Sequence, residues 1–79
     1  MEISMIVESI RVDKKSKRIK HFTSSGVKEI KTKNKGDEAI SEGLAYVNNY
    51  MTENNFKLIN VTTMDAGTVA YIIYDLFRE

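Results

Sequence analysis

The chain has 79 residues, and its 12 basic and 11 acidic residues leave a formal net charge of only +1. It contains no cysteine, which excludes disulfides and thiolate metal sites as sources of stability. No apolar run approaches the roughly 20 residues that a membrane-spanning helix needs, so no span is predicted.

The length predicts one domain over residues 1–79, because a chain this short cannot divide and still bury a core in each part. Such a chain buries only about 60% of its surface on folding, which makes self-association a natural source of stability. An acidic residue at position 2, with no basic stretch before an apolar run, predicts no signal peptide, and the expected compartment is the cytoplasm. Abundant Lys, Asn and Ile without Pro or Trp are typical of an AT-rich bacterial or phage genome.

The charges are distributed unevenly along the chain. Residues 10–35 contain ten basic residues against two acidic ones, whereas residues 36–79 contain two basic residues against seven acidic ones. We therefore expect the molecule to be electrically two-sided.

Alternating side chains predict three strands before the first helix, over residues 2–12, 17–23 and 27–32, with turns at 13–16 and 24–26. The third strand is short and polar. In the first strand the two faces are Ile3, Met5 and Val7 against Ile6, Ile10 and Val12. In the second they are Arg18, Lys20 and Phe22 against Ile19, His21 and Thr23.

A helix is predicted over residues 37–54. Four apolar residues recur at the helical period and form one stripe: Ile40, Leu44, Val47 and Met51. Asp37 suits the N-cap, and Asn54 and Asn55 can end the helix because asparagine tolerates the left-handed conformation of a C-cap.

Two further strands are predicted over residues 56–64 and 69–78, joined by a hairpin turn at 65–68. In the first of these, Phe56 and Leu58 face opposite to Ile59 and Val61. In the second, Val69, Tyr71, Ile73 and Phe77, interrupted by Asp75, face opposite to Ala70, Ile72, Tyr74 and Leu76. The predicted fold class is α+β, an antiparallel sheet in the order βββαββ with one helix packed on one face.

The junction of the predicted helix and the fourth strand, Asn54-Asn55-Phe56-Lys57-Leu58-Ile59-Asn60-Val61, resembles the Glu-Gly-Trp-Glu-Leu-Val-Ser-Val signature of a group of small bacterial proteins of unknown function. Asn55 stands in the place of the C-cap glycine of that signature and Phe56 in the place of its tryptophan. Residues 71–78 correspond to the terminal strand of those proteins. The resemblance covers about the last half of the chain and implies an α+β fold with no known activity.

The inventory of catalytic groups is poor, so we predict no enzyme, no metal and no cofactor. His21 is the one histidine of the chain, and we expect it on the surface or in the hairpin rather than as a general base. The carboxylates near residue 37 are explained by a helix cap and a solvated face. The four glycines are isolated and form no phosphate loop, and the tyrosines suit core edges or interfaces.

The last strand generates the first functional hypothesis. One helix is about 10 Å wide and strands lie about 4.8 Å apart, so a single helix cannot cover both faces of a sheet. We expect an uncovered apolar face that forms a homodimer or binds another protein. The candidate interface residues are Tyr71, Ile72, Ile73, Tyr74, Leu76 and Phe77. The centre of the interface is either Tyr71, Ile73 and Phe77 or Ile72, Tyr74 and Leu76. The alternative to an uncovered face is a sheet that curls around the helix.

The basic segment generates the second hypothesis, a hairpin over residues 11–22 that binds nucleic-acid phosphates or an acidic partner. Its candidate residues are Lys14, Lys15, Lys17, Arg18, Lys20 and His21. The alternative is a solvated loop whose lysines keep an edge strand from aggregating.

Overall fold

The computed structural model describes residues 1–11, 16–32 and 37–79, so most of the predicted turn at 13–16 lies outside the described residues. The strands are β1 (Glu2–Arg11), β2 (Ser16–Thr23), β3 (Gly26–Thr32), β4 (Lys57–Ala66) and β5 (Val69–Arg78). The helix, α1 (Asp37–Asn54), lies between β3 and β4 in the chain. The predicted α+β class and the element order βββαββ are confirmed.

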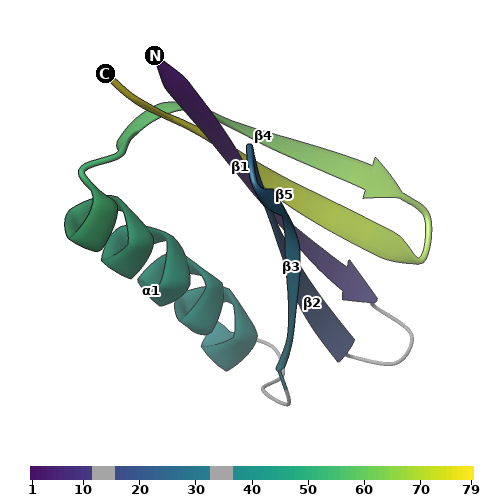
Figure 1. The fold of residues 1–79 in the computed structure, drawn as a ribbon. Coiled ribbons are helices and arrows are strands. Elements are labelled where there is room, and N and C mark those ends of the chain that lie inside the picture. The colour runs from purple at the N-terminus through teal and green to yellow at the C-terminus, as the bar shows by residue number, and fades with distance from the viewer. Residues whose placement is uncertain (12–15, 33–36) are drawn as a thin grey trace.

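The strands form one antiparallel sheet in the order β3-β2-β1-β5-β4. Two hairpin runs, β1-β2-β3 and β4-β5, meet where β1 pairs with β5, and α1 carries the chain from the β3 edge to the β4 edge. Figure 1 shows α1 across one face of the sheet and the two chain ends close together. Within the described residues, no helix covers the opposite face.

The core lies between α1 and the helix-facing side of β1, β2 and β5. Its buried apolar side chains are Ile6, Ile19, Val47, Phe56, Tyr74 and Leu76. Full burial of a large apolar side chain contributes about 1.5–3 kcal/mol, so this small cluster is the main source of stability. Tyr46, Tyr50 and Met51 of the helix pack against it from the side.

The predicted apolar stripe of the helix is only partly buried. Val47 is in the core, but Ile40 and Leu44 are 41% and 45% exposed. Gly43, one turn before Val47, is buried directly against the carboxylate of Glu8. Because this carboxylate occupies the space beneath α1, the helix presents a residue without a side chain there, and Ile40 and Leu44 lie on its flank.

The predicted end of the helix at Asn54 and Asn55 is confirmed. Asn55 has a φ of 57°, the left-handed conformation of a C-cap. The backbone N–H of Phe56 then donates to the carbonyl of Met51 at 3.1 Å, which is the long-range bond of a Schellman motif. The Asn54 side chain donates to the carbonyl of Tyr50 at 3.1 Å, so the last turn of α1 is well satisfied.

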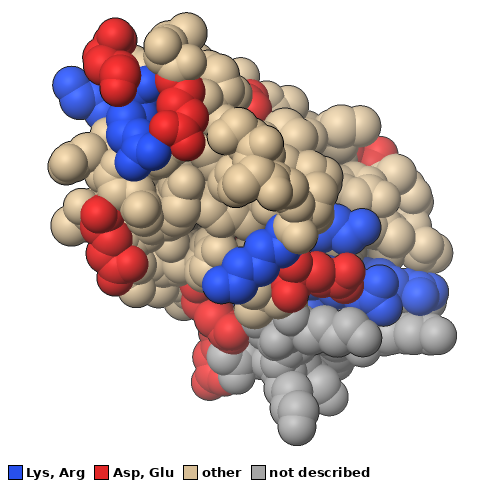
Figure 2. Space-filling view, viewed as in Figure 1, with Lys and Arg blue, Asp and Glu red and all other residues tan. Residues whose placement is uncertain are grey.

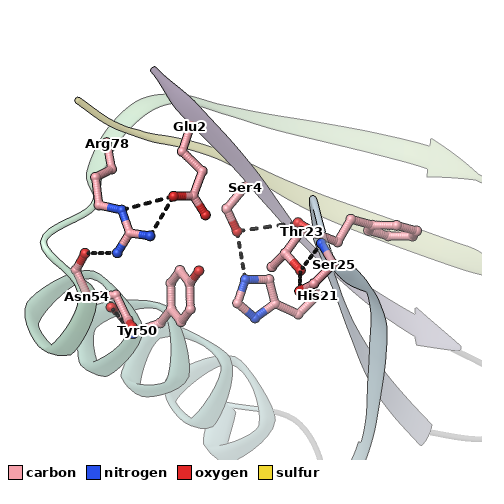
Figure 3. A network of polar contacts seen from close by, with 9 residues as sticks. Glu2, Ser4, His21, Thr23, Ser25, Tyr50, Asn54 and Arg78 are labelled. Atoms are coloured by element: carbon pink, nitrogen blue, oxygen red, sulfur yellow. Dashed lines mark hydrogen bonds and ion pairs between the residues drawn. The ribbon is translucent and has the colours of Figure 1, made fainter.

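Arg78, at the end of β5, fastens this helix end to the sheet (Figure 3). Its Nη1 donates to the carbonyl of Asn54 at 2.8 Å, and its Nε and Nη2 donate to Oε1 of Glu2 at 3.2 and 2.5 Å. The guanidinium also lies 4.6 Å from the centre of the Phe56 ring. Since the last turn of α1 has no basic residue of its own, Arg78 supplies the cation that the negative end of the helix dipole favours.

Strand β4 departs from the predicted alternation at a β-bulge. The register between β4 and β5 shifts between Leu58 and Asn60. Leu58 and Val61 are therefore partners of the helix-facing Leu76 and Tyr74 and share one side of the sheet. The prediction that they face opposite sides was wrong, because the extra residue of a bulge reverses the phase of everything beyond it.

The turn between β4 and β5 is shorter than predicted. The two strands run to Ala66 and from Val69, so only residues 67–68 form the turn. Gly67 has a φ of 79°, and its N–H donates to Oδ1 of Asp65 at 3.1 Å.

Asp37 was predicted as the N-cap of the helix, and its side chain lies outside the part of the chain that the structure describes. Among the described residues, no helix combines the length and apolarity that a membrane crossing requires.

Gly43→Ala is expected to destabilise the protein, although alanine favours a helix by about 1 kcal/mol. The added Cβ would overlap the buried Glu8 carboxylate, and overpacking of this kind costs about 1–3 kcal/mol. Urea unfolding followed by circular dichroism measures the change. In a Glu8→Ala background the substitution meets no carboxylate, so an equal cost in both backgrounds would contradict the close packing.

Candidate functional site

Every second residue of β1, β2 and β5 points away from α1, on the side that we call the open face. Val7 fixes the phase, because it is the partner of both Lys20 and Ile73 while its neighbour Ile6 is buried beneath the helix. The apolar side chains of the open face on these three strands are Ile3, Met5, Val7, Phe22, Val69, Tyr71, Ile73 and Phe77. Ile3 is 49% exposed and the others are half-buried. The open face is thus a continuous apolar surface across three strands.

The structure divides the six predicted interface residues between the two sides of the sheet. Tyr71, Ile73 and Phe77 lie on the open face. Tyr74 and Leu76 are 5% and 0% exposed beneath α1. Ile72 packs against the same core from that side. The alternative centred on Tyr74 is therefore wrong, because the helix already covers it.

A hollow of about 470 Å³ lies on the open face, where β2, β1 and β5 lie side by side. Its lining combines three cations with an aromatic ring and small side chains: Val7, Ser9, Arg11, Arg18, Lys20, Val69 and Tyr71. Arg18 reaches Glu29 of β3 with 3.7 Å between Nε and Oε1. Both of these side chains are exposed, so the pair is weak.

The predicted basic hairpin is not a single surface. Lys17 and His21 are only 2% and 4% exposed, because they alternate with Arg18 and Lys20 and point under the helix. Lys14 and Lys15 lie outside the described residues. Of the six predicted residues, the structure places Arg18 and Lys20 on the open face. Arg11, which the prediction omitted, joins these two, and its even spacing from Val7 along β1 was the signal for it.

Figure 2 shows how charge is arranged on one side of the molecule. Positive and negative side chains are mixed near the two chain ends, and a second mixed group lies beside the ends of β1 and β2. A mainly uncharged area separates the two groups. The sequence halves of opposite charge therefore do not form two separate faces in this view.

His21 is a buried structural residue rather than a surface one. Its Nε2 lies 2.7 Å from Ser4 Oγ and its Nδ1 lies 3.0 Å from the Tyr46 hydroxyl. The Tyr50 ring meets the imidazole edge-on with 4.1 Å between ring centres. Figure 3 shows Ser4 and His21 pointing toward each other from β1 and β2, beneath the helix. His21 does lie in the hairpin of β1 and β2, but the expectation of a surface position was wrong, because His21 is in phase with the buried Ile19.

A serine paired with a histidine can suggest a nucleophile and its base, but this geometry does not suit that chemistry. Ser4 is 1% exposed, so a substrate has no access to its hydroxyl. That hydroxyl also donates to the carbonyl of Phe22 at 3.4 Å.

Glu8 is the second buried polar residue that sequence reasoning missed. It is 0% exposed, its Oε1 accepts a hydrogen bond from the Tyr74 hydroxyl at 3.3 Å, and its Oε2 has no hydrogen-bond partner. Burial raises the pKa of Glu8, against the opposing effect of the Lys17 charge. Burial and the nearby carboxylate raise the pKa of Tyr74 to about 12. The period-two pattern already placed Glu8 in phase with Ile6, on the helix-facing side.

No other chemistry emerges from the described part of the chain, where no three His, Asp or Glu side chains gather as metal ligands would. In comparisons with known proteins, no family model, curated protein or solved structure matches the chain. The resemblance of residues 54–61 to small bacterial proteins stays a prediction. The open face is consequently the strongest candidate site.

Stability is expected to depend on His21 below neutral pH. Burial, helped by the Lys28 charge, lowers the pKa of His21 from the ordinary value of 6.5. The folded state therefore has the full benefit of neutral His21 above pH 6.5 and loses it as the pH falls through the lower folded pKa. Urea unfolding of wild type and His21→Gln from about pH 7 to about pH 5 measures this. Parallel loss of stability in both proteins would contradict a buried neutral imidazole.

Proposed function

We propose that the protein is a small non-enzymatic interaction module that forms a homodimer by stacking the open faces of two sheets. The observation that carries the proposal is the set of apolar side chains on the open face, which α1 leaves uncovered. Protein interfaces are enriched in aromatic residues and methionine. Met5, Phe22, Tyr71 and Phe77 fit that composition.

The area of the open face favours a second copy as the occupant. The open face continues onto the same side of the edge strands β3 and β4, and five strands at about 4.8 Å with up to ten residues at about 3.3 Å give about 24 by 30 Å. That is about 700 Å², close to the roughly 800 Å² per partner of a stable interface. Two sheets can pack aligned at a separation of about 10 Å, and a two-fold axis makes the same face serve both chains.

Charge favours one orientation of the two sheets. Asp75 lies on the open face as the partner of Met5, whereas Arg11 is the partner of Val69 near the other end. A two-fold axis across the strands, near the level of Glu8 and Ile72, would bring each Asp75 over the Val69 of the second copy and beside its Arg11. Each carboxylate would then be buried opposite a cation rather than alone, which avoids the cost of an unpaired charge.

Ile73→Glu is expected to halve the molecular mass of the assembly, because it buries a charge at the centre of the stack. Light scattering coupled to size-exclusion chromatography measures the mass against the 9.0 kDa of one chain. Asn48→Glu, on an exposed part of α1, is the control and should leave the mass unchanged. Asp75→Arg should weaken the assembly, and adding Arg11→Asp should restore it. A folded Ile73→Glu chain with the wild-type mass would exclude face stacking.

The hollow with Arg11, Arg18, Lys20 and Tyr71 favours a second candidate function, binding of single-stranded nucleic acid. Cations follow a phosphate backbone while an aromatic ring stacks on a base. A bound nucleic-acid strand and a second copy of the protein would use the same face, so the two would compete for it.

Binding of a single-stranded oligonucleotide by these three cations should weaken about twentyfold between 50 and 200 mM salt, because three phosphate contacts give a logarithmic slope of about −2. Fluorescence anisotropy measures the affinity. Arg18→Glu should abolish the binding, and Lys57→Glu at the other end of the sheet is the control. Equal loss in both variants would indicate nonspecific attraction and exclude the hollow.

A further inference from the structure

Strand β4 forms one edge of the sheet and is exposed along its whole length. All ten residues of β4 are exposed. The strand pairs with β5 on one side and ends the sheet on the other, so its outward backbone N–H and C=O groups have no strand beside them. Such an edge is a template for another strand.

The two edges of the sheet differ in how they are protected. On β3 the edge carries Lys28 and Glu29, the charged side chains that discourage pairing with another strand. On β4 the seven residues from position 58 to position 64, Leu-Ile-Asn-Val-Thr-Thr-Met, carry no charge. Four of them are large apolar residues with about half of their surface exposed: Leu58, Ile59, Val61 and Met64. The composition of β4 therefore favours pairing rather than avoiding it.

The helix does not protect this edge. Tyr46 and Tyr50 contact His21 of β2, so that flank of α1 faces the β2 side of the sheet. The helical period puts Ile40 and Leu44 on the other flank, toward β5 and β4, where they remain exposed. A band of uncovered apolar residues thus continues from the flank of α1 to the helix-facing side of β4.

We infer that β4 pairs antiparallel with β4 of a second copy, which joins two sheets into one of ten strands. An uncharged strand is the complement that an uncharged edge requires, and β4 itself is such a strand. Antiparallel pairing of a strand with itself has two-fold symmetry, so one contact satisfies both chains. Beyond the bulge, β4 is regular from Asn60 to Ala66, which gives a straight segment for pairing.

This interface is separate from the stacking of open faces. The two-fold axis of edge pairing is perpendicular to the sheet, so it leaves both open faces uncovered and on the same side. The two contacts can form together or alone, and variants distinguish them. A chain with Ile73→Glu retains only the edge, and a chain with a modified edge retains only the face.

The edge is tested by Val61→Lys with Thr63→Lys, which places on β4 the lysines that protect natural edges. Both positions are exposed, so the fold should tolerate the change. In the Ile73→Glu background, light scattering should give twice the 9.0 kDa chain mass with the native edge and a single chain mass with the lysines. Asn48→Lys is the control and should leave the mass doubled.

Hydrogen–deuterium exchange of the unmodified protein gives an independent readout. Amides of β4 should exchange more slowly as the protein concentration rises, whereas those of the other edge, β3, should not change. A single-chain Ile73→Glu protein together with concentration-independent exchange in β4 would overturn edge pairing and leave the stacking proposal intact. Conversely, if Ile73→Glu leaves the mass unchanged while the lysines halve it, the stacking proposal fails and edge pairing stands.

Discussion

The width of the single helix is the constraint on which the rest of the structure depends. One helix of about 10 Å lies on a sheet about 24 Å across, and it covers β2, β1 and β5 on one side only. The core is therefore small, and it is built from six buried apolar side chains. Everything that the helix does not cover, the open face and both sides of β4, is left with apolar side chains in contact with water. The proposed binding surfaces follow from a sheet that is too wide for its helix.

Beneath the helix, the core contains more polar chemistry than a chain this small would be expected to bury. Ser4, Glu8, Lys17 and His21 are all nearly inaccessible, and they lie in phase with Ile6 and Ile19. His21 hydrogen-bonds to Tyr46 of the helix, and Glu8 accepts a hydrogen bond from Tyr74 of β5. Gly43 is the counterpart of Glu8 in this arrangement, since a carboxylate can be accommodated there only under a residue without a side chain.

Much of the fold could be predicted from the sequence, because it rests on local periodicity. The bounds of α1 and β5 and the division of β5 into two faces follow from the spacing of apolar residues. The orientation of the helix could not be predicted, because it depends on Glu8, a residue 35 positions away that ordinarily lies on a surface. The bulge in β4 and the burial of Lys17 and His21 were missed for a related reason. A run of basic residues suggests a surface, but strand alternation sends every second one inward.

The contact between Glu2 and Arg78 makes it possible to change the order of the strands along the chain. These residues are partners at the same level of adjacent central strands, and they are joined by two hydrogen bonds. A short peptide could therefore link the present ends without disturbing the sheet, and new ends could be opened at the turn formed by residues 67–68. In such a circular permutant β4 would become the last strand of the chain. The order in which the strands are synthesised could then be changed while their spatial arrangement is kept.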